Sequence, residues 1–192
     1  MERKEAIRYA EKYRSELLTA LGMVDLLLLS RAMDAFAEAR TLNRRIFICG
    51  NGAGATAASR FLCDLLKTAG YTLSSNSRVL ALSDQNPIAR TKSADVSSDR
   101  IFVDQLQNFA EAGDVVMGIS SAGRATSLMR VFEYATCVGC RTIALMGPEG
   151  CGAASLAEIN ILVPASQVAN VEDGLMIVCH MIGNCLLEMP TS

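Results

Sequence analysis

The chain has 192 residues, of which 51% are hydrophobic and 20% are charged, and this suits one globular domain with a sizeable core. The formal net charge of −2 and a pI near 5.5 provide none of the excess positive charge typical of proteins that bind nucleic acid or anionic membranes. No segment has the apolar length of a membrane span, and the first residues, MERKEAIRYAEKYRSE, predict a charged helix rather than a signal peptide. We therefore expect a cytoplasmic protein with no nucleic-acid or membrane partner.

Two helices are predicted in residues 1–44. Apolar residues recur there at helical spacing, and the pattern breaks around Gly22. The second helix is apolar over much of its surface, so we expect the stretch 24–37 to be buried between subunits. The predicted organisation is a single domain, in which residues 1–44 form oligomerisation helices and residues 45–192 form an α/β core.

Five short β-rich runs then alternate with segments of helical period. The runs are RIFICG, RVLALSD, DVVMGIS, RTIALMG and INILVP. This alternation is typical of βαβ units, and the apolar continuity of the runs fits strands that are covered on both faces. A last helix is predicted from about residue 168 to 188, before Pro190. We expect a five-stranded parallel sheet flanked by helices, with an N-terminal helical hairpin.

Two turns stand out at the predicted carboxyl ends of the strands, where ligands bind in such sheets. A glycine-rich turn follows the first strand at residues 50–54, and SSAGRATS follows the third strand and leads into a helix. Glycines let the backbone approach an anion, and the N–H groups of a helix start together with hydroxyls can surround a phosphate. The predicted ligand is therefore phosphorylated, and the candidate binding residues are Asn51, Gly52, Gly54, Ser120, Ser121, Gly123, Arg124 and Thr126.

A dinucleotide site is a less favoured interpretation of the first turn. Gly50, Gly52 and Ala55 satisfy the G-x-G-x-x-A fingerprint after a strand. That fingerprint also requires an acidic residue roughly 20 residues further on, and Asp84 lies well beyond this position. The serine-rich turn has no role in a dinucleotide site.

The cysteines raise a second alternative, because Cys137 and Cys140 form a C-x-x-C pair. A redox or zinc site is disfavoured, since Gly139 is typical of a helix end and no second cysteine pair completes a zinc site. We interpret the cysteines in apolar runs as core thiols; these are Cys49, Cys63, Cys179 and Cys185.

Taken together, the motifs resemble the sugar isomerase (SIS) domain family, and within it the phosphoheptose isomerase group. The resemblance is carried by ICGNGAGATAASRFLCDL, ALSD, GDVVMGISSAGRATSLM, TIALMGPEG, ILVP and the last helix with His180. It implies a Rossmann-like three-layer sandwich, a homotetramer built partly on the N-terminal helices, and a phosphosugar bound at the serine-rich turn near a subunit interface. It also implies isomerisation of sedoheptulose 7-phosphate or a related sugar phosphate. The alternative is a non-catalytic tetramer that senses a sugar phosphate or scaffolds a partner protein such as a replication initiator.

Several positions of the two turns depart from the family pattern. In the first turn the family reads G-N-G-G-S, and Gly54 here lacks the serine hydroxyl. The third turn reads S-T-S-G-N-S in the family, and here Arg124 replaces the asparagine. The Arg124 guanidinium either binds the phosphate in a bidentate manner or points into solvent. Thr126 supplies one further hydroxyl. Two further hydroxyls of the family pattern are lost at Ala122 and Ala125.

The positions that carry chemistry in the family are also altered. Where isomerases have a histidine and, four residues later, a glutamate, this chain has Arg60 and Asp64, and arginine cannot ligate a metal. On the last helix we align Glu172, Leu175 and His180 with the family's glutamine and two histidines.

By this resemblance we predict that Asp64 or Glu172 is the base, that His180 is the acid, and that Arg60 replaces a metal electrostatically. A purely structural role for His180, the only histidine of the chain, stays equally open. We expect no tightly bound metal, no cofactor, and an ion pair between Arg60 and Asp64.

Overall fold

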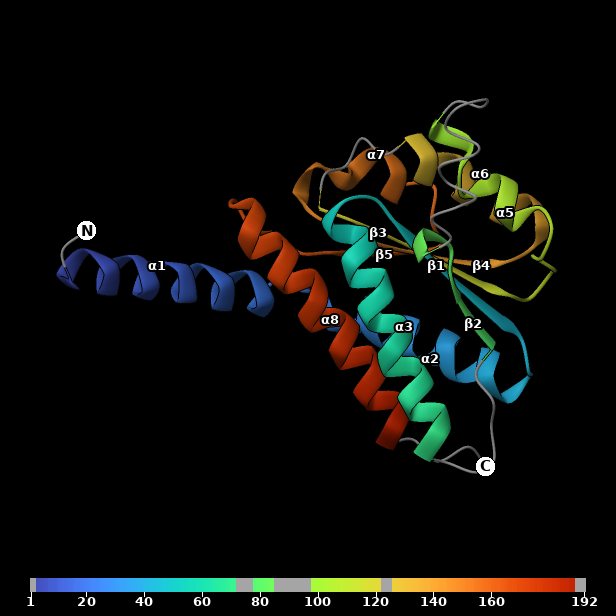
Figure 1. Cartoon of the computed structure of the whole chain (residues 1–192), viewed down its shortest axis with the longest axis horizontal. Coiled ribbons are helices and arrows are strands. Elements are labelled where there is room, and N and C mark those ends of the chain that lie inside the picture. Colours follow the sequence, from blue (N-terminus) through green and yellow to red (C-terminus); the bar gives the residue numbers. More distant parts are fainter. Residues whose placement is uncertain (1–2, 72–77, 85–97, 122–125, 189–192) are drawn as a thin grey trace.

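The computed structural model describes residues 3–71, 78–84, 98–121 and 126–188 (Figure 1). Within these ranges five strands form one sheet in the order β2-β1-β3-β4-β5, and all neighbouring strands are parallel. Each strand lies within one of the five predicted runs, which confirms the expected sheet. The strands are β1 (Arg45–Gly50), β2 (Arg78–Ala81), β3 (Val115–Ser120), β4 (Arg141–Met146) and β5 (Ile159–Leu162).

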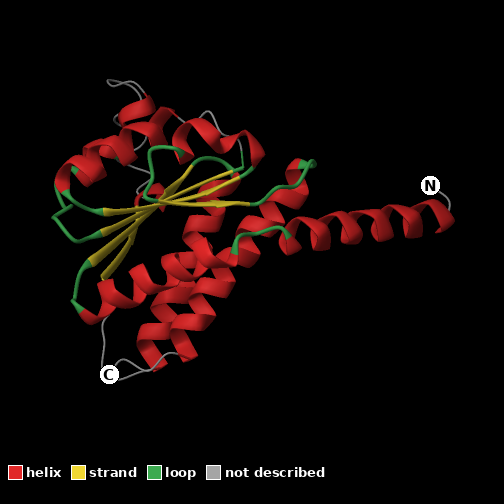
Figure 2. Ribbon diagram, turned by 180° about the vertical axis from the view of Figure 1, so that it is seen from behind, coloured by secondary structure: helices red, strands yellow, loops and turns green. Residues whose placement is uncertain are grey.

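Helices cover both faces of the sheet, which lies edge-on between them in Figure 2. One face is covered by α2 (Leu26–Thr41), α3 (Ala53–Tyr71) and α8 (Val168–Glu188). The other face is covered by α5 (Val103–Leu106), α6 (Thr126–Val138) and α7 (Cys151–Ala154). The fold is therefore the three-layer sandwich that the resemblance implied. No described helix is both long enough and apolar enough to cross a bilayer.

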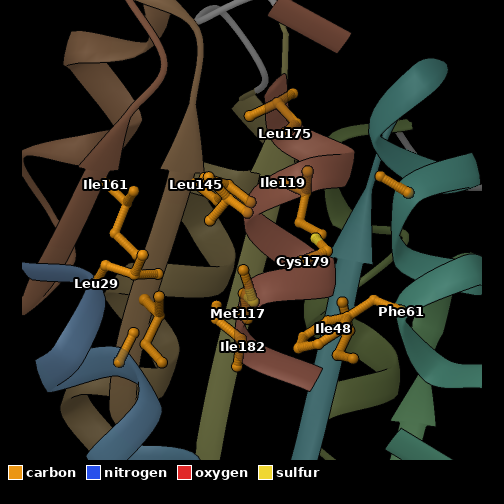
Figure 3. Packing of buried hydrophobic residues seen from close by; sticks show 14 of the residues in the cluster. Leu29, Ile48, Phe61, Met117, Ile119, Leu145, Ile161, Leu175, Cys179 and Ile182 are labelled. Carbon is orange, nitrogen blue, oxygen red and sulfur yellow. The ribbon is translucent and has the colours of Figure 1, made fainter. Parts of the chain in front are cut away.

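The continuous apolar runs are explained by burial on both sides of the sheet. In β3 every residue is buried: Met117 and Ile119 pack toward α8, whereas Val116 packs toward α6. Figure 3 shows side chains of the central strands packed against side chains of the helices: Ile48, Met117, Ile119 and Leu145 face Phe61 of α3 and Cys179 and Ile182 of α8. This packing fixes α3 and α8, the two helices that carry the candidate acid–base residues, against the sheet.

The first helix, α1 (Arg3–Gly22), projects from the body of the molecule as an arm (Figures 1 and 2). Among its residues only Ala20 is buried within the chain. The helix ends at the predicted break, and Asp25 starts α2 by accepting the backbone N–H groups of Leu27 at 2.8 Å and Leu28 at 3.1 Å. The predicted helical pair is confirmed.

Much of the second helix is buried within its own chain. The stretch 24–37 was predicted to be buried between subunits, but Leu29, Ala32 and Phe36 pack in the core of the same chain. The Phe36 ring meets Phe61 of α3 edge to face, with ring centroids 5.5 Å apart. The reason is that the apolar stripe covers one face of the chain's own sheet. The large apolar side chains that stay exposed lie just before this segment, at Met23, and at its start, at Leu26 and Leu27.

The C-x-x-C segment is the end of α6, as expected. Gly139 has a φ of 88°, its N–H bonds to Thr136 O, and the N–H of Cys140 bonds to Ala135 O, which together form a Schellman motif. The six cysteines whose side chains are described are free. Cys49 and Cys179 are buried as predicted, whereas Cys63 is exposed because it lies on the outer face of α3.

Candidate functional site

The two predicted turns lie side by side, because β1 and β3 are neighbours and their carboxyl ends share one edge of the sheet. The Asn51 Nδ2 donates a hydrogen bond to the Ser127 Oγ at 2.8 Å, which ties the first turn to the start of α6. Gly52, with a φ of 54°, adopts the left-handed conformation that a glycine tolerates at no steric cost. The structure thus brings the glycine-rich and serine-rich turns together.

Gly54 is a glycine because of packing. A Cβ atom at this position would overlap the carbonyl oxygen of Ile119 at the end of β3. A Cβ at Gly50 would come within 2.6 Å of backbone atoms of both Gly54 and Ile119. The first turn of α3 therefore rests directly on β3, and this contact leaves no room for the side chain of the serine in the family pattern.

Ser83 was not predicted as a site residue, yet it fastens the first turn. Its Oγ donates to Gly50 O at 2.9 Å and accepts the N–H of Gly50 at 3.0 Å. The next residue, Asp84, accepts a hydrogen bond from Ser59 of α3. Both residues lie just after β2 at the carboxyl edge of the sheet, within the ALSD motif, and this position and motif are the features of the sequence that could have identified them.

The serine-rich turn is described on both sides of its centre. Ser120 is buried at the end of β3, Ser121 is half-buried, and Thr126 is exposed as the first residue of α6. The Ser121 Oγ lies 3.5 Å from the Glu172 Oε1 on α8. The centre of the turn, with Ala122, Gly123, Arg124 and Ala125, lies outside the described residues.

A cavity of about 200 Å³ opens between the serine-rich turn and the start of α8. Its described lining offers the hydroxyls of Ser121 and Ser166 and the carboxylate of Glu149 over apolar walls. Such a mixture suits a small polyhydroxylated ligand, whose hydroxyls need convergent polar partners. The lining residues are Ser121, Pro148, Glu149, Ala165, Ser166, Val168 and Val171.

Three of the four candidate acid–base residues form one cluster between α3 and α8. The Arg60 Nη2 lies 3.2 Å from the Asp64 Oδ1, so the expected ion pair is present. The other carboxylate oxygen, Asp64 Oδ2, lies 2.8 Å from the His180 Nδ1. The two helices approach closely here, since a Cβ on Gly183 would lie 3.3 Å from the Asp64 Cβ.

The contact between Asp64 and His180 determines what the imidazole can do. The two atoms lie at ion-pair distance, so the carboxylate lies against the Nδ1 side of the ring, and the Nε2 on the other side of the ring is the nitrogen left to face a ligand. The side chain of Asp64 is 16% exposed and that of His180 is 37% exposed, so the imidazole is the more accessible of the two. Asp64 is therefore placed to orient His180, and its predicted role as a base stays a prediction.

Glu172 belongs to a different contact. It lies on α8 eight residues before His180, a rise of about 12 Å along the helix, and its Oε1 faces the Ser121 Oγ. Among the described residues, no three histidine, cysteine, aspartate or glutamate side chains are grouped as a metal ion requires. The structure therefore joins Arg60, Asp64 and His180 into one group and places Glu172 at the serine-rich turn.

Comparison with known proteins agrees with this architecture. Residues 9–147 match the model of the SIS domain family. The phosphoheptose isomerase of Citrifermentans bemidjiense is 30% identical over 172 residues, which cover 89% of this chain and 88% of that protein.

Two solved structures share the fold over nearly their whole length. The phosphoheptose isomerase of Neisseria gonorrhoeae superposes with a TM-score of 0.85 at 19% identity, covering 97% of this chain and 99% of that one. The enzyme of Francisella tularensis gives a TM-score of 0.85 at 18% identity, covering 98% and 100%. Since the family match spans most of the chain and the fold agrees, the chain belongs to the SIS domain family and is a relative of the phosphoheptose isomerases.

Proposed function

We propose that this protein binds a phosphosugar and interconverts its aldose and ketose forms, with sedoheptulose 7-phosphate or a related sugar phosphate as substrate. The observation that carries the proposal is the 2.8 Å contact between Asp64 and His180 on two helices that flank the sheet. It supplies an oriented imidazole for proton transfer between oxygens. The names of the phosphoheptose isomerase relatives supply the substrate class.

We place the phosphate of the ligand at the serine-rich turn. Ser120 and Ser121 provide hydroxyls there, and α6, a helix of 13 residues, begins immediately after it at Thr126. Backbone N–H groups at a helix start favour an anion electrostatically. The carbon chain of the sugar would then extend into the adjacent cavity toward Glu172 and α8.

The proposed reaction moves one proton between two carbons and one between two oxygens. From the ketose, one carboxylate, Asp64 or Glu172, takes a proton from C1 while the C2 oxygen gains one, which gives an enediol; C2 is then protonated as the C1 hydroxyl loses its proton. His180 carries the oxygen protons through its Nε2. Arg60 pairs with Asp64 through one nitrogen and has further N–H donors to stabilise the enediolate charge. No metal or cofactor is part of this scheme.

Phosphosugar affinity tests the proposed site. In the double variant Ser120→Ala, Ser121→Ala we expect affinity for sedoheptulose 7-phosphate to fall about 10- to 100-fold, because hydrogen bonds to a charged phosphate are lost. Titration calorimetry measures this, with Ser155→Ala as control, an exposed serine whose hydroxyl bonds only locally to Gly152 O. Unchanged affinity in the double variant contradicts the assignment of this turn.

A second candidate function is phosphosugar sensing without turnover, or scaffolding of a partner protein. The feature that favours it is Arg60, which stands where the resemblance places a metal-binding histidine. A protein that binds sedoheptulose 7-phosphate and does not convert it would have this second function.

We also propose that the protein is a homotetramer. Met23, Leu26 and Leu27 are 64%, 71% and 71% exposed, and the projecting α1 exposes Ile7 and Leu18, so apolar side chains of both N-terminal helices face outward. Large apolar side chains exposed in this number are typical of an interface. Sedimentation at micromolar concentration should show a tetramer, and Leu26→Asp with Leu27→Asp should shift it toward smaller species. A stable wild-type monomer contradicts the proposal.

We also propose that the protein is cytoplasmic. This location is supported by the free state of the six cysteines whose side chains are described, which suits a reducing compartment. Recovery of the protein with secreted proteins after cell fractionation contradicts it.

A further inference from the structure

The start of α8 and the loop before it separate two cavities. The cavity of about 200 Å³ beside the serine-rich turn and a second cavity of about 230 Å³ beside α1 share Ala165 and Ser166 in their linings. The second cavity is lined by Ser15, Glu16, Thr19, Ala20, Pro164, Ala165 and Ser166. Space therefore lies on both sides of the loop that leads into α8.

Polar contacts from α1 hold this segment. The Tyr13 Oη donates to the Asp173 Oδ2 at 2.7 Å. One helical turn later, the Glu16 Oε2 accepts from the Gln167 Nε2 at 2.9 Å and from the Asn170 Nδ2 at 3.3 Å. Residues 13 and 16 share a face of α1, and the three partners recur at every third residue on one face at the start of α8. The inner half of α1 therefore runs along the first turns of α8 (Figure 1).

Burial and charge both bear on the strength of these hydrogen bonds. Asn170 is fully buried, so loss of the Glu16 carboxylate would leave a buried amide without this partner. The hydrogen bond to Asp173, and to a lesser extent burial, raises the pKa of Tyr13 to about 12, so its hydroxyl remains a donor throughout the neutral range. Both contacts involve a carboxylate and are charge-assisted.

The same helical turns carry a residue of the proposed site. Asp173 follows Glu172 directly, and the Glu172 Oε1 lies 3.5 Å from the Ser121 Oγ. We infer that Tyr13 and Glu16 are positioning residues: they hold the first turns of α8 so that Glu172 stays at the serine-rich turn. This inference rests on the proposed phosphosugar function, and it assigns to α1 a role in ligand binding within its own chain.

The test compares two tyrosines on the same helix. Tyr13→Phe removes the hydroxyl that bonds to Asp173. Tyr9→Phe removes a hydroxyl from a neighbouring tyrosine that is 63% exposed; the two ring centroids lie 6.3 Å apart. We expect Tyr13→Phe to weaken the binding of sedoheptulose 7-phosphate by about 3- to 10-fold in titration calorimetry, as loss of one hydrogen bond allows. Tyr9→Phe should bind like the wild type. Equal affinity in the two variants overturns the inference.

A double-variant comparison separates positioning from a general loss of structure. If Tyr13 acts through Glu172, then Tyr13→Phe has no further effect on affinity in a Glu172→Ala background. A loss of the same size in both backgrounds shows that Tyr13 does not act through Glu172 and contradicts the inference.

Hydrogen exchange tests the contact without ligand. Val171 N–H bonds to Gln167 O in the first turn of α8, so amides of residues 171–175 report on this turn. They should exchange faster in Tyr13→Phe than in Tyr9→Phe or the wild type. Unchanged exchange shows that α1 does not hold α8. If the wild type does not bind sedoheptulose 7-phosphate, the proposed function is wrong and so is the role of α1 in ligand binding. Faster exchange in Tyr13→Phe would then still show that α1 holds α8.

Discussion

Replacing His180 with alanine should abolish turnover of sedoheptulose 7-phosphate and leave its binding largely intact. The imidazole Nδ1 is held by Asp64 at 2.8 Å, so the side chain is oriented to exchange protons through its Nε2. Loss of a positioned general acid–base group lowers a rate by about 10²- to 10⁴-fold. The serine-rich turn, where we propose that the phosphate binds, lies between β3 and α6, away from this helix position, so its hydroxyls are retained. Turnover and calorimetric affinity, measured on the same preparation, give both values.

The matched control is the neighbouring Met181→Ala, which truncates a side chain of α8 that is 41% exposed. It should retain both turnover and affinity. Undiminished turnover by His180→Ala contradicts the acid–base role. A loss of affinity as large as the loss of turnover indicates that His180 binds the sugar or maintains the fold instead.

Restoring the family's serine at Gly54 should destabilise the protein rather than improve phosphate binding. The added Cβ overlaps the carbonyl oxygen of Ile119, a backbone atom of a fully buried strand that has no room to move. Overpacking of this kind costs about 3 kcal/mol, which corresponds to a fall in Tm of about 6–12 °C for a chain of this size. Thermal unfolding followed by circular dichroism measures the shift.

Gly152→Ser is the control for this substitution, because a Cβ at Gly152 meets no atom within 4 Å. Its Tm should lie within about 2 °C of the wild type, as is usual for an exposed substitution. A Gly54→Ser variant that is as stable as this control, or that binds phosphosugar more tightly than the wild type, shows that the first turn can move away from β3.

The sheet was predictable because each strand is covered on both faces and so appears in the sequence as a short apolar run. The ion pair of Arg60 and Asp64 was predictable for a similar reason, since residues four apart share one face of a helix. By contrast, the link from Asp64 to His180 joins residues of two helices far apart in the chain. Periodicity alone does not predict such a contact, and only the resemblance brought these residues into one site.

Two features escaped prediction because they depend on tertiary packing. Ser83 bonds to Gly50, 33 residues away, and this pairing exists only because β2 and β1 are neighbours in the sheet. The apolar pattern of α2 correctly predicted a buried face, but it did not say which surface buries it; Phe36 packs in the chain's own core. Amphipathicity predicts that a face is covered and leaves the covering element open.

The most direct test of the proposed isomerase is conversion of sedoheptulose 7-phosphate by the wild-type protein, followed by NMR with a metal chelator present. We expect signals of a seven-carbon aldose phosphate to appear much faster than in the uncatalysed reaction. The chelator should have no effect, since Arg60 stands at the metal-binding position of the family and pairs with Asp64. Binding without conversion contradicts the isomerase proposal and supports the sensing function. Activity that is lost to chelator and restored by zinc contradicts the role assigned to Arg60.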